Sequence, residues 1–259
     1  MKRMYLVFGI LLILFLISVL FYIFQPLGEQ FYIISDLTVI IFSFLAFVFG
    51  LYTYKFYGFG SVKGKALLFL TLGVFFWFLG ETTWGIYEIV LGVKEPIASI
   101  ADMFWLIGYP LFLMGFYYVW KIASTSISKK RLMILSVSII AVCSFMAYIT
   151  TPILTDTEMS FAGKISTAGY VIGDMLILIA LMIAVTYLFG GKFAKGWSII
   201  LLSVFMMSAA DIYYMNFLEV YETGSLIDIF WNLSYILLAF GFFYHREVVK
   251  EVFDGIKKK

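Results

Sequence analysis

Eight long apolar stretches follow one another along the chain, and short polar segments separate them. They cover Met4–Phe24, Phe31–Tyr52, Ala66–Val90, Ile97–Val119, Leu132–Ile149, Ala168–Phe189, Gly196–Phe217 and Leu226–Tyr244. A helix rises about 1.5 Å per residue and a bilayer core is about 30 Å thick, so each stretch can cross it or nearly so. The pattern predicts an all-α, polytopic membrane protein with eight transmembrane helices.

The composition excludes several classes of protein. Hydrophobic residues make up 63% of the 259 residues and charged residues only 13%, which is more apolar sequence than a soluble core can absorb. The single cysteine, Cys143, cannot form an intrachain disulfide, and the single histidine, His245, excludes a multi-histidine metal site within one chain. We expect no nucleic-acid partner, and the sequence identifies neither a metal nor a cofactor.

Basic residues are concentrated in alternate connections between the predicted helices. Sixteen of the 18 fall on one predicted face: Lys2, Arg3, Lys55, Lys63, Lys65, Lys121, Lys129, Lys130, Arg131, Lys192, Lys195, Arg246, Lys250, Lys257, Lys258 and Lys259. Only Lys94 and Lys164 fall outside this set. Because basic loops stay in the cytoplasm, both termini are predicted to be cytoplasmic in a multi-pass plasma-membrane protein.

The second half of the chain repeats the first. Ser99–Tyr118 and Ser225–Tyr244 align without a gap and share nine of twenty residues. The alignment extends to Tyr32–Asp36 with Tyr170–Asp174, and Glu81 aligns with Asp211. We therefore predict two parallel four-helix repeats, residues 1–124 and 125–247, followed by a basic amphipathic cytoplasmic tail, residues 248–259.

Both copies carry an acid, an indole and a phenol on one helix face, because positions i, i+3 and i+7 lie together. Carboxylates within membrane helices are costly and mark candidate sites. The candidate ligand-binding residues are Asp36, Glu81, Trp84, Glu88, Asp102, Trp105, Tyr109, Asp174, Asp211, Tyr214, Asp228, Trp231 and Tyr235. No Lys or Arg within these helices pairs with the acids, so some are expected to be protonated, to bind a cation or to accept hydrogen bonds from Tyr and Trp.

The depth of these residues predicts one cavity near the outer side. Carboxylates and aromatic faces together suit a small cation entering from outside. An alternative interpretation is structural, since acids in a first helical turn often cap the helix and Trp and Tyr often mark the membrane interface. This structural interpretation applies less readily to Glu81 and Asp211, which lie well inside their helices, than to the four acids near helix starts, Asp36, Asp102, Asp174 and Asp228.

Short motifs in the chain resemble those of two families of membrane proteins. The pattern W-x-x-G-E-x-x-W-x-x-Y-E from Trp77 to Glu88, followed by the A-D-x-F-W stretch from Ala101, resembles the membrane input regions of bacterial diguanylate cyclases and histidine kinases. That resemblance implies a sensory role. No kinase or cyclase domain follows Tyr244, so a receptor would need a separate partner. Gly173 and Asp174 are similar to a G-D element of lysoplasmalogenase-like hydrolases.

Three functions are therefore considered. The first is a membrane-embedded binding or sensory module with an outward-facing acidic and aromatic pocket, with the C-terminal tail as the site of a cytoplasmic signalling partner. The second is a transporter or proton-coupled carrier with its site between the two repeats. The third is an intramembrane hydrolase acting on lipid, although no nucleophile is recognisable.

Overall fold

The computed structural model describes most of the chain. The described residues are 2–93, 98–122, 127–157, 159–188, 194–217 and 220–257. Several predictions lie outside them, namely those that concern Lys94, Ile97, Phe189, Lys192, Lys258, Lys259 and the repeat boundary at 124 and 125.

Eight α-helices account for nearly all of the described residues, which contain no strand. The helices are α1 (Lys2–Phe24), α2 (Phe31–Tyr57), α3 (Val62–Gly85), α4 (Ile100–Ile122), α5 (Lys129–Thr155), α6 (Phe161–Leu188), α7 (Ala194–Asn216) and α8 (Asp228–Lys257). Two short turns are η1 (Gly28–Gln30) and η2 (Ile86–Val90). The all-α prediction is confirmed.

Seven of these helices, α1 to α7, are long and apolar enough to cross a membrane. Their outward faces fit that environment, because Leu6 and Ile13 of α1 and Ile140 of α5 are 64%, 58% and 64% exposed. The eighth, α8, is less apolar because it carries polar groups such as Asp228 and Asn232. These two side chains are only 4% and 0% exposed, so protein rather than lipid surrounds them.

The predicted ends of several elements are wrong. The connection predicted from Thr150 to Thr167 is much shorter, because α5 continues through Pro152 to Thr155 and α6 begins at Phe161. The last helix, predicted to end at Tyr244, continues as α8 to Lys257. A sequence window detects the apolar core of a helix, and these turns at the helix ends are less apolar than that core.

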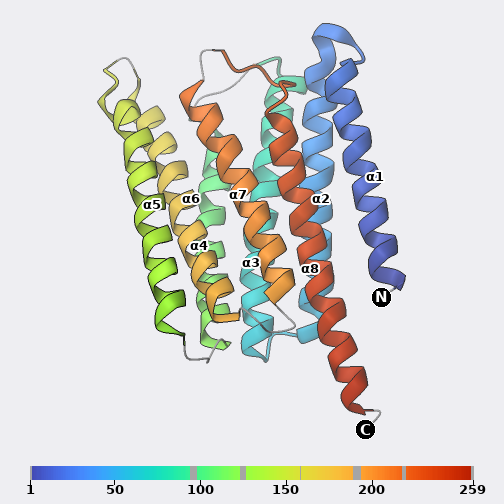
Figure 1. Cartoon of the computed structure of the whole chain (residues 1–259). Coiled ribbons are helices and arrows are strands. Elements are labelled where there is room, and N and C mark those ends of the chain that lie inside the picture. The colour runs from blue at the N-terminus through green and yellow to red at the C-terminus, as the bar shows by residue number, and fades with distance from the viewer. Residues whose placement is uncertain are drawn as a thin grey trace.

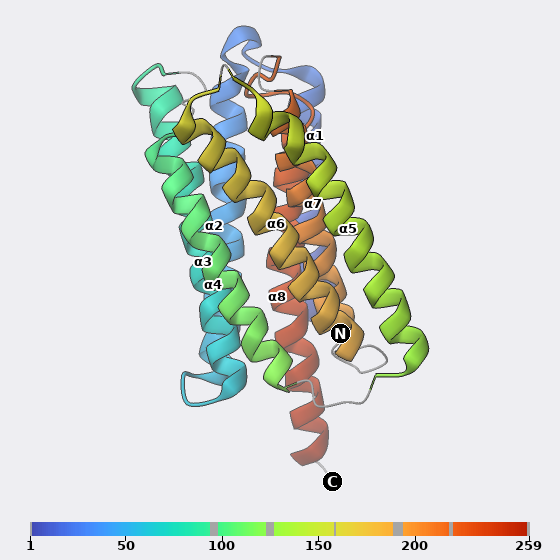
Figure 2. The same ribbon diagram turned by 90° about the vertical axis from the view of Figure 1, so that its left-hand side faces the viewer.

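Six helices form a ring in the order α2, α3, α4, α6, α7, α8, with α8 closing against α2. Outside the ring, α1 packs against α8 and α2, and α5 packs mainly against α6 (Figures 1 and 2). Within the ring, α3 packs closely against α4 and α7 against α8.

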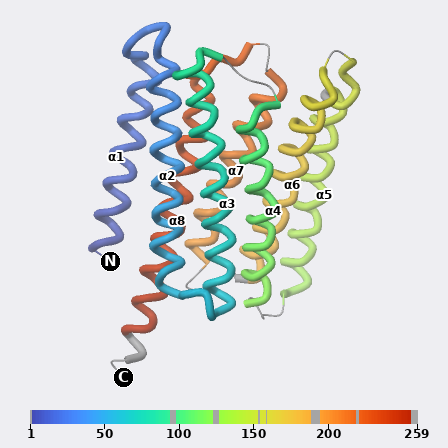
Figure 3. Tube along the Cα trace, turned by 180° about the vertical axis from the view of Figure 1, so that it is seen from behind, coloured from blue at the N-terminus to red at the C-terminus, as the bar shows by residue number. Residues whose placement is uncertain are grey.

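Both termini lie at the same end of the bundle (Figures 1 and 3). We call the opposite end the distal end. Because α4 and α8 begin at the distal end while α3 and α7 finish there, their carboxylates come to one level. Toward the termini the ring interior is filled by Leu70, Phe116, Ile200 and Phe242, each at most 2% exposed.

Candidate functional site

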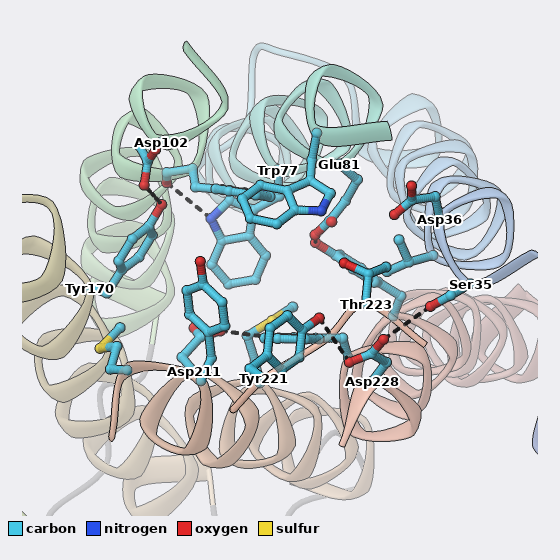
Figure 4. Close-up of a pocket in the computed structure, with 18 of the residues that line it drawn as sticks. Ser35, Asp36, Trp77, Glu81, Asp102, Tyr170, Asp211, Tyr221, Thr223 and Asp228 are labelled. Carbon is cyan, nitrogen blue, oxygen red and sulfur yellow. Dashed lines mark hydrogen bonds between the residues drawn. The ribbon is translucent and has the colours of Figure 1, made fainter. Parts of the chain in front are cut away.

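A cavity of about 90 Å³ lies inside the ring near the distal end. This is room for several water molecules or part of a small ligand. Eleven of the thirteen predicted site residues line it: Asp36, Glu81, Trp84, Asp102, Trp105, Tyr109, Asp211, Tyr214, Asp228, Trp231 and Tyr235. Figure 4 shows their carboxylates arranged around the cavity on several different helices.

Glu81 of α3 and Asp211 of α7 are two lining acids that are bonded in the same way. The Tyr235 hydroxyl donates to Glu81 Oε1 at 2.6 Å, and the Trp231 indole N–H donates to Asp211 Oδ1 at 2.7 Å. Both donors come from α8. These hydrogen bonds orient the two carboxyl groups, and a carboxylate can accept more than one bond, so both acids can still accept a donor from the cavity that they line.

Asp102 and Asp228 form a second pair with a different role. Asp228 Oδ2 accepts from Gly224 N–H at 2.7 Å and from the Ser35 hydroxyl at 3.0 Å, while Oδ1 accepts from the Tyr221 hydroxyl at 3.0 Å. Ser225 adds a longer bond to Oδ1 at 3.4 Å. Asp228 therefore fixes the start of α8 to α2 and to the preceding loop.

Asp102 fixes the start of α4 to α6 in a similar way. Its Oδ1 accepts from the Ser166 and Tyr170 hydroxyls of α6, both at 2.7 Å, and its Oδ2 accepts from the backbone and side chain of Ser99. In both acids every oxygen already accepts hydrogen bonds. The structural interpretation considered for these residues thus describes their bonding, although they also line the cavity.

Glu88 and Asp174 are the two predicted residues that do not line the cavity. Asp174 is fully buried and accepts from the Tyr109 hydroxyl at 2.9 Å, and Glu88 accepts from the Thr223 hydroxyl at 2.9 Å. Glu88 leaves the stripe of Glu81 and Trp84 because η2 is a π-helical turn, in which Leu91 N–H bonds to Ile86 O five residues back. The extra residue in that turn rotates the side chains that follow.

Aromatic rings connect the two halves of the cavity wall. Trp84 lies 5.7 Å from Trp105 and 6.3 Å from Tyr214, and Tyr214 lies 6.1 Å from Trp231, all between ring centroids. The series therefore runs from α4 through α3 and α7 to α8. Its tilted and edge-to-face geometries are those that aromatic pairs prefer, so the wall is preformed.

Several lining residues were not predicted: Ser35, Val39, Trp77, Tyr170, Met207, Met215, Tyr221 and Thr223. Tyr170 begins the repeated segment that ends at Asp174, so a signal for it existed. Tyr221 and Thr223 lie in the α7–α8 connection, where no periodicity applies. Burial raises the pKa of Tyr221 well above its ordinary value and the Asp228 carboxylate adds to this, so its hydroxyl remains a donor.

The lining contains no Lys, Arg or His among the residues described. Within the same residues, no group of three His, Cys, Asp or Glu side chains could hold a metal ion. Comparisons with protein-family models, with curated proteins and with solved structures give no match to this chain.

Replacing Gly173 by Ala should destabilise the fold beside the cavity. A Cβ at Gly173 would lie 2.5 Å from the Tyr109 ring, which donates to the adjacent Asp174. We expect a loss of about 1–3 kcal/mol from overpacking, seen as a lower thermal midpoint in detergent. Gly9→Ala is the matched control, because nothing lies within 4 Å of its Cβ position, and it should be neutral or slightly stabilising. Equal midpoints for the two variants would contradict the packing described here.

Proposed function

We propose that this protein binds a small organic cation in its distal cavity. The observation that carries the proposal is the pair of carboxylates, Glu81 and Asp211, in an aromatic-lined cavity whose described lining has no basic residue. Carboxylates inside the bundle require compensation, and the Tyr235 and Trp231 donors that these two acids accept from are uncharged. A bound cation would supply the missing charge, while Trp84, Trp105 and Trp231 would offer their ring faces to it.

The cation would enter from outside the cell. Basic side chains such as Lys63, Lys129 and Arg246 belong to the end of the bundle that carries the termini, and Asp102 and Asp228 to the distal end. The positive-inside rule then orients the distal end outward, in a multi-pass plasma-membrane protein with cytoplasmic termini.

This orientation predicts the result of reporter fusions along the chain. Fusions after Pro26, Thr157 and Glu222 should report the outside, and fusions after Gly60 and Lys257 the cytoplasm. Alkaline phosphatase and green fluorescent protein report the two sides with opposite responses. A cytoplasmic signal from any two of the first three positions would overturn the orientation.

We also propose that the eight helices form two parallel four-helix repeats, α1–α4 and α5–α8, related by an axis near the membrane normal. The pairing of helices supports this, because α2 packs on α8 as α6 packs on α4. The exchange of α2, α3 and α4 for α6, α7 and α8 leaves the order of the ring unchanged. The aligned residues Glu81 and Asp211 then contribute equivalent acids to one shared cavity.

Among the functions considered, a sensory role fits this site best. Helix α8 connects the cavity with the cytoplasmic end of the bundle. It supplies Asp228, Trp231 and Tyr235 to the cavity and continues to Lys257. A ligand that moves α8 would therefore move a helix within reach of a cytoplasmic partner. This agrees with the resemblance to membrane input regions of signalling proteins.

A carrier is the second candidate, because the cavity lies between two matched halves. The packing between the cavity and the cytoplasmic end argues against a carrier, because the apolar side chains of Leu70, Phe116 and Phe242 are almost completely buried there. Uptake of a radiolabelled alkylamine into proteoliposomes distinguishes the two candidates. Binding without uptake is expected for the sensor, and saturable uptake would favour the carrier.

Ligand stabilisation of the purified protein tests the proposal. Two probes of equal length, n-pentylamine and n-pentanol, differ only in the charged end, because an alkylamine is protonated at neutral pH. The amine should raise the thermal unfolding midpoint in detergent in a saturable manner, and the alcohol should not. Equal effects of both probes would reject the cation site.

A further inference from the structure

One corner of the cavity lacks hydrogen-bond donors. Asp36 of α2 is only 2% exposed, lines the cavity and has a carboxylate oxygen, Oδ2, that accepts no hydrogen bond. Figure 4 shows its carboxylate at the cavity edge beside Thr223 and Ser35. Unpartnered buried carboxylate oxygens are costly, so their retention calls for an explanation.

The neighbouring donors are directed elsewhere. The Ser35 hydroxyl donates to Asp228 Oδ2 at 3.0 Å, and the Thr223 hydroxyl donates to Glu88 Oε1 at 2.9 Å. Glu88 lies beside Asp36, within hydrogen-bonding reach of its carboxyl group, and adds a second carboxyl group to this corner. The two nearest hydroxyl groups are therefore directed at other acids and not at Asp36 Oδ2.

The aligned residue in the second half provides a comparison. Asp174 also has an oxygen, Oδ2, without a hydrogen bond, but its other oxygen accepts from Tyr109 and it does not line the cavity. Of the two aligned acids, Asp36 is the one that a molecule in the cavity can reach. The two halves of the cavity are thus chemically different.

We propose that Asp36 binds a primary ammonium group, and that the ligand is a linear aliphatic diamine with its second ammonium group at Glu81 and Asp211. This inference rests on the proposed cation site. A primary ammonium group carries a positive charge and three N–H donors, which are what the Asp36 corner lacks. A quaternary ammonium group has no N–H donor and would leave Asp36 Oδ2 unsatisfied.

Titration of two probes of equal length, putrescine and n-pentylamine, tests the inference. Isothermal calorimetry on the full chain in detergent should show putrescine binding at least about tenfold more tightly, because one further charge-assisted bond is made. Asp36→Asn should remove this advantage, so that the variant binds the two probes with similar affinity, and its thermal midpoint without ligand shows that it is folded. Glu222→Gln, at an exposed acid in the α7–α8 connection, is the control and should keep it.

Each result separates this inference from the proposed function. If wild type binds both probes equally, or if Asp36→Asn weakens both to the same extent, the diamine assignment is wrong and the cation site remains. If neither amine binds to wild type, both proposals fail. The wild-type comparison stands without the variant, so a poorly folded Asp36→Asn protein does not prevent a decision.

Discussion

Replacing Glu81 by Gln should reduce alkylamine affinity by about tenfold to a hundredfold while the protein stays folded. Glutamine keeps the shape of the side chain, and its carbonyl oxygen can still accept the bond that Tyr235 donates at 2.6 Å. The substitution therefore removes the charge and little else. Calorimetric titration with n-pentylamine measures the affinity, and the thermal midpoint without ligand measures the fold.

Glu29→Gln is the matched control for this experiment. Glu29 lies in η1, at the distal end like Glu81, but its side chain is exposed. The same charge is removed from the same end of the bundle, so any general electrostatic effect appears in both variants. Unchanged amine affinity in Glu81→Gln, with a lower affinity in Glu29→Gln, would show that attraction to the surface rather than the cavity accounts for binding.

Replacing Asp228 by Ala should produce the largest loss of stability. Three donors would lose their acceptor at a buried position: Gly224 N–H, the Ser35 hydroxyl and the Tyr221 hydroxyl. Each unsatisfied buried donor costs about 1–3 kcal/mol, so we expect a total loss of about 3 kcal/mol or more. The attachment of α8 to α2 and to the α7–α8 connection should loosen, with a marked drop in thermal midpoint.

Asp254→Ala provides the comparison within the same helix. Asp254 is exposed near the other end of α8, so its removal should change the free energy of unfolding by no more than about 0.5 kcal/mol. A similar small effect from Asp228→Ala would mean that the distal hydrogen bonds do not support the fold. It would also mean that these hydrogen bonds do not hold the cavity acids in position.

The helices were predictable from sequence because hydrophobic length is a strong signal. The grouping of Glu81, Asp102, Asp211 and Asp228 was predictable as well, since each acid lies near the distal end of a helix and none tolerates lipid. Of the three expected ways to compensate these acids, hydrogen bonding is visible in the structure. A Tyr or Trp side chain donates to each of the four acids. Asp102 and Asp228 also accept hydrogen bonds from serine side chains and from backbone N–H groups.

Other features of the site could not be predicted, for reasons that are specific to each residue. The position of Glu88 depends on the π-helical turn at Ile86–Val90, and helical periodicity assumes that no such turn exists. Tyr221 and Thr223 reach the cavity from a connection whose path no sequence pattern encodes. Asp102 and Asp228 accept hydrogen bonds from partners on other helices, such as Ser166 and Ser35, and a sequence pattern does not identify such partners.

The central claim is that the distal cavity selects a positive charge, and one equilibrium measurement tests it directly. Purified protein in detergent is titrated with n-pentylamine and with n-pentanol, in wild type and in Glu81→Gln. The account predicts saturable, one-site binding of the amine to wild type, at least about tenfold tighter than binding of the alcohol, and loss of this preference in the variant. Equal affinity of wild type for the two probes would contradict it.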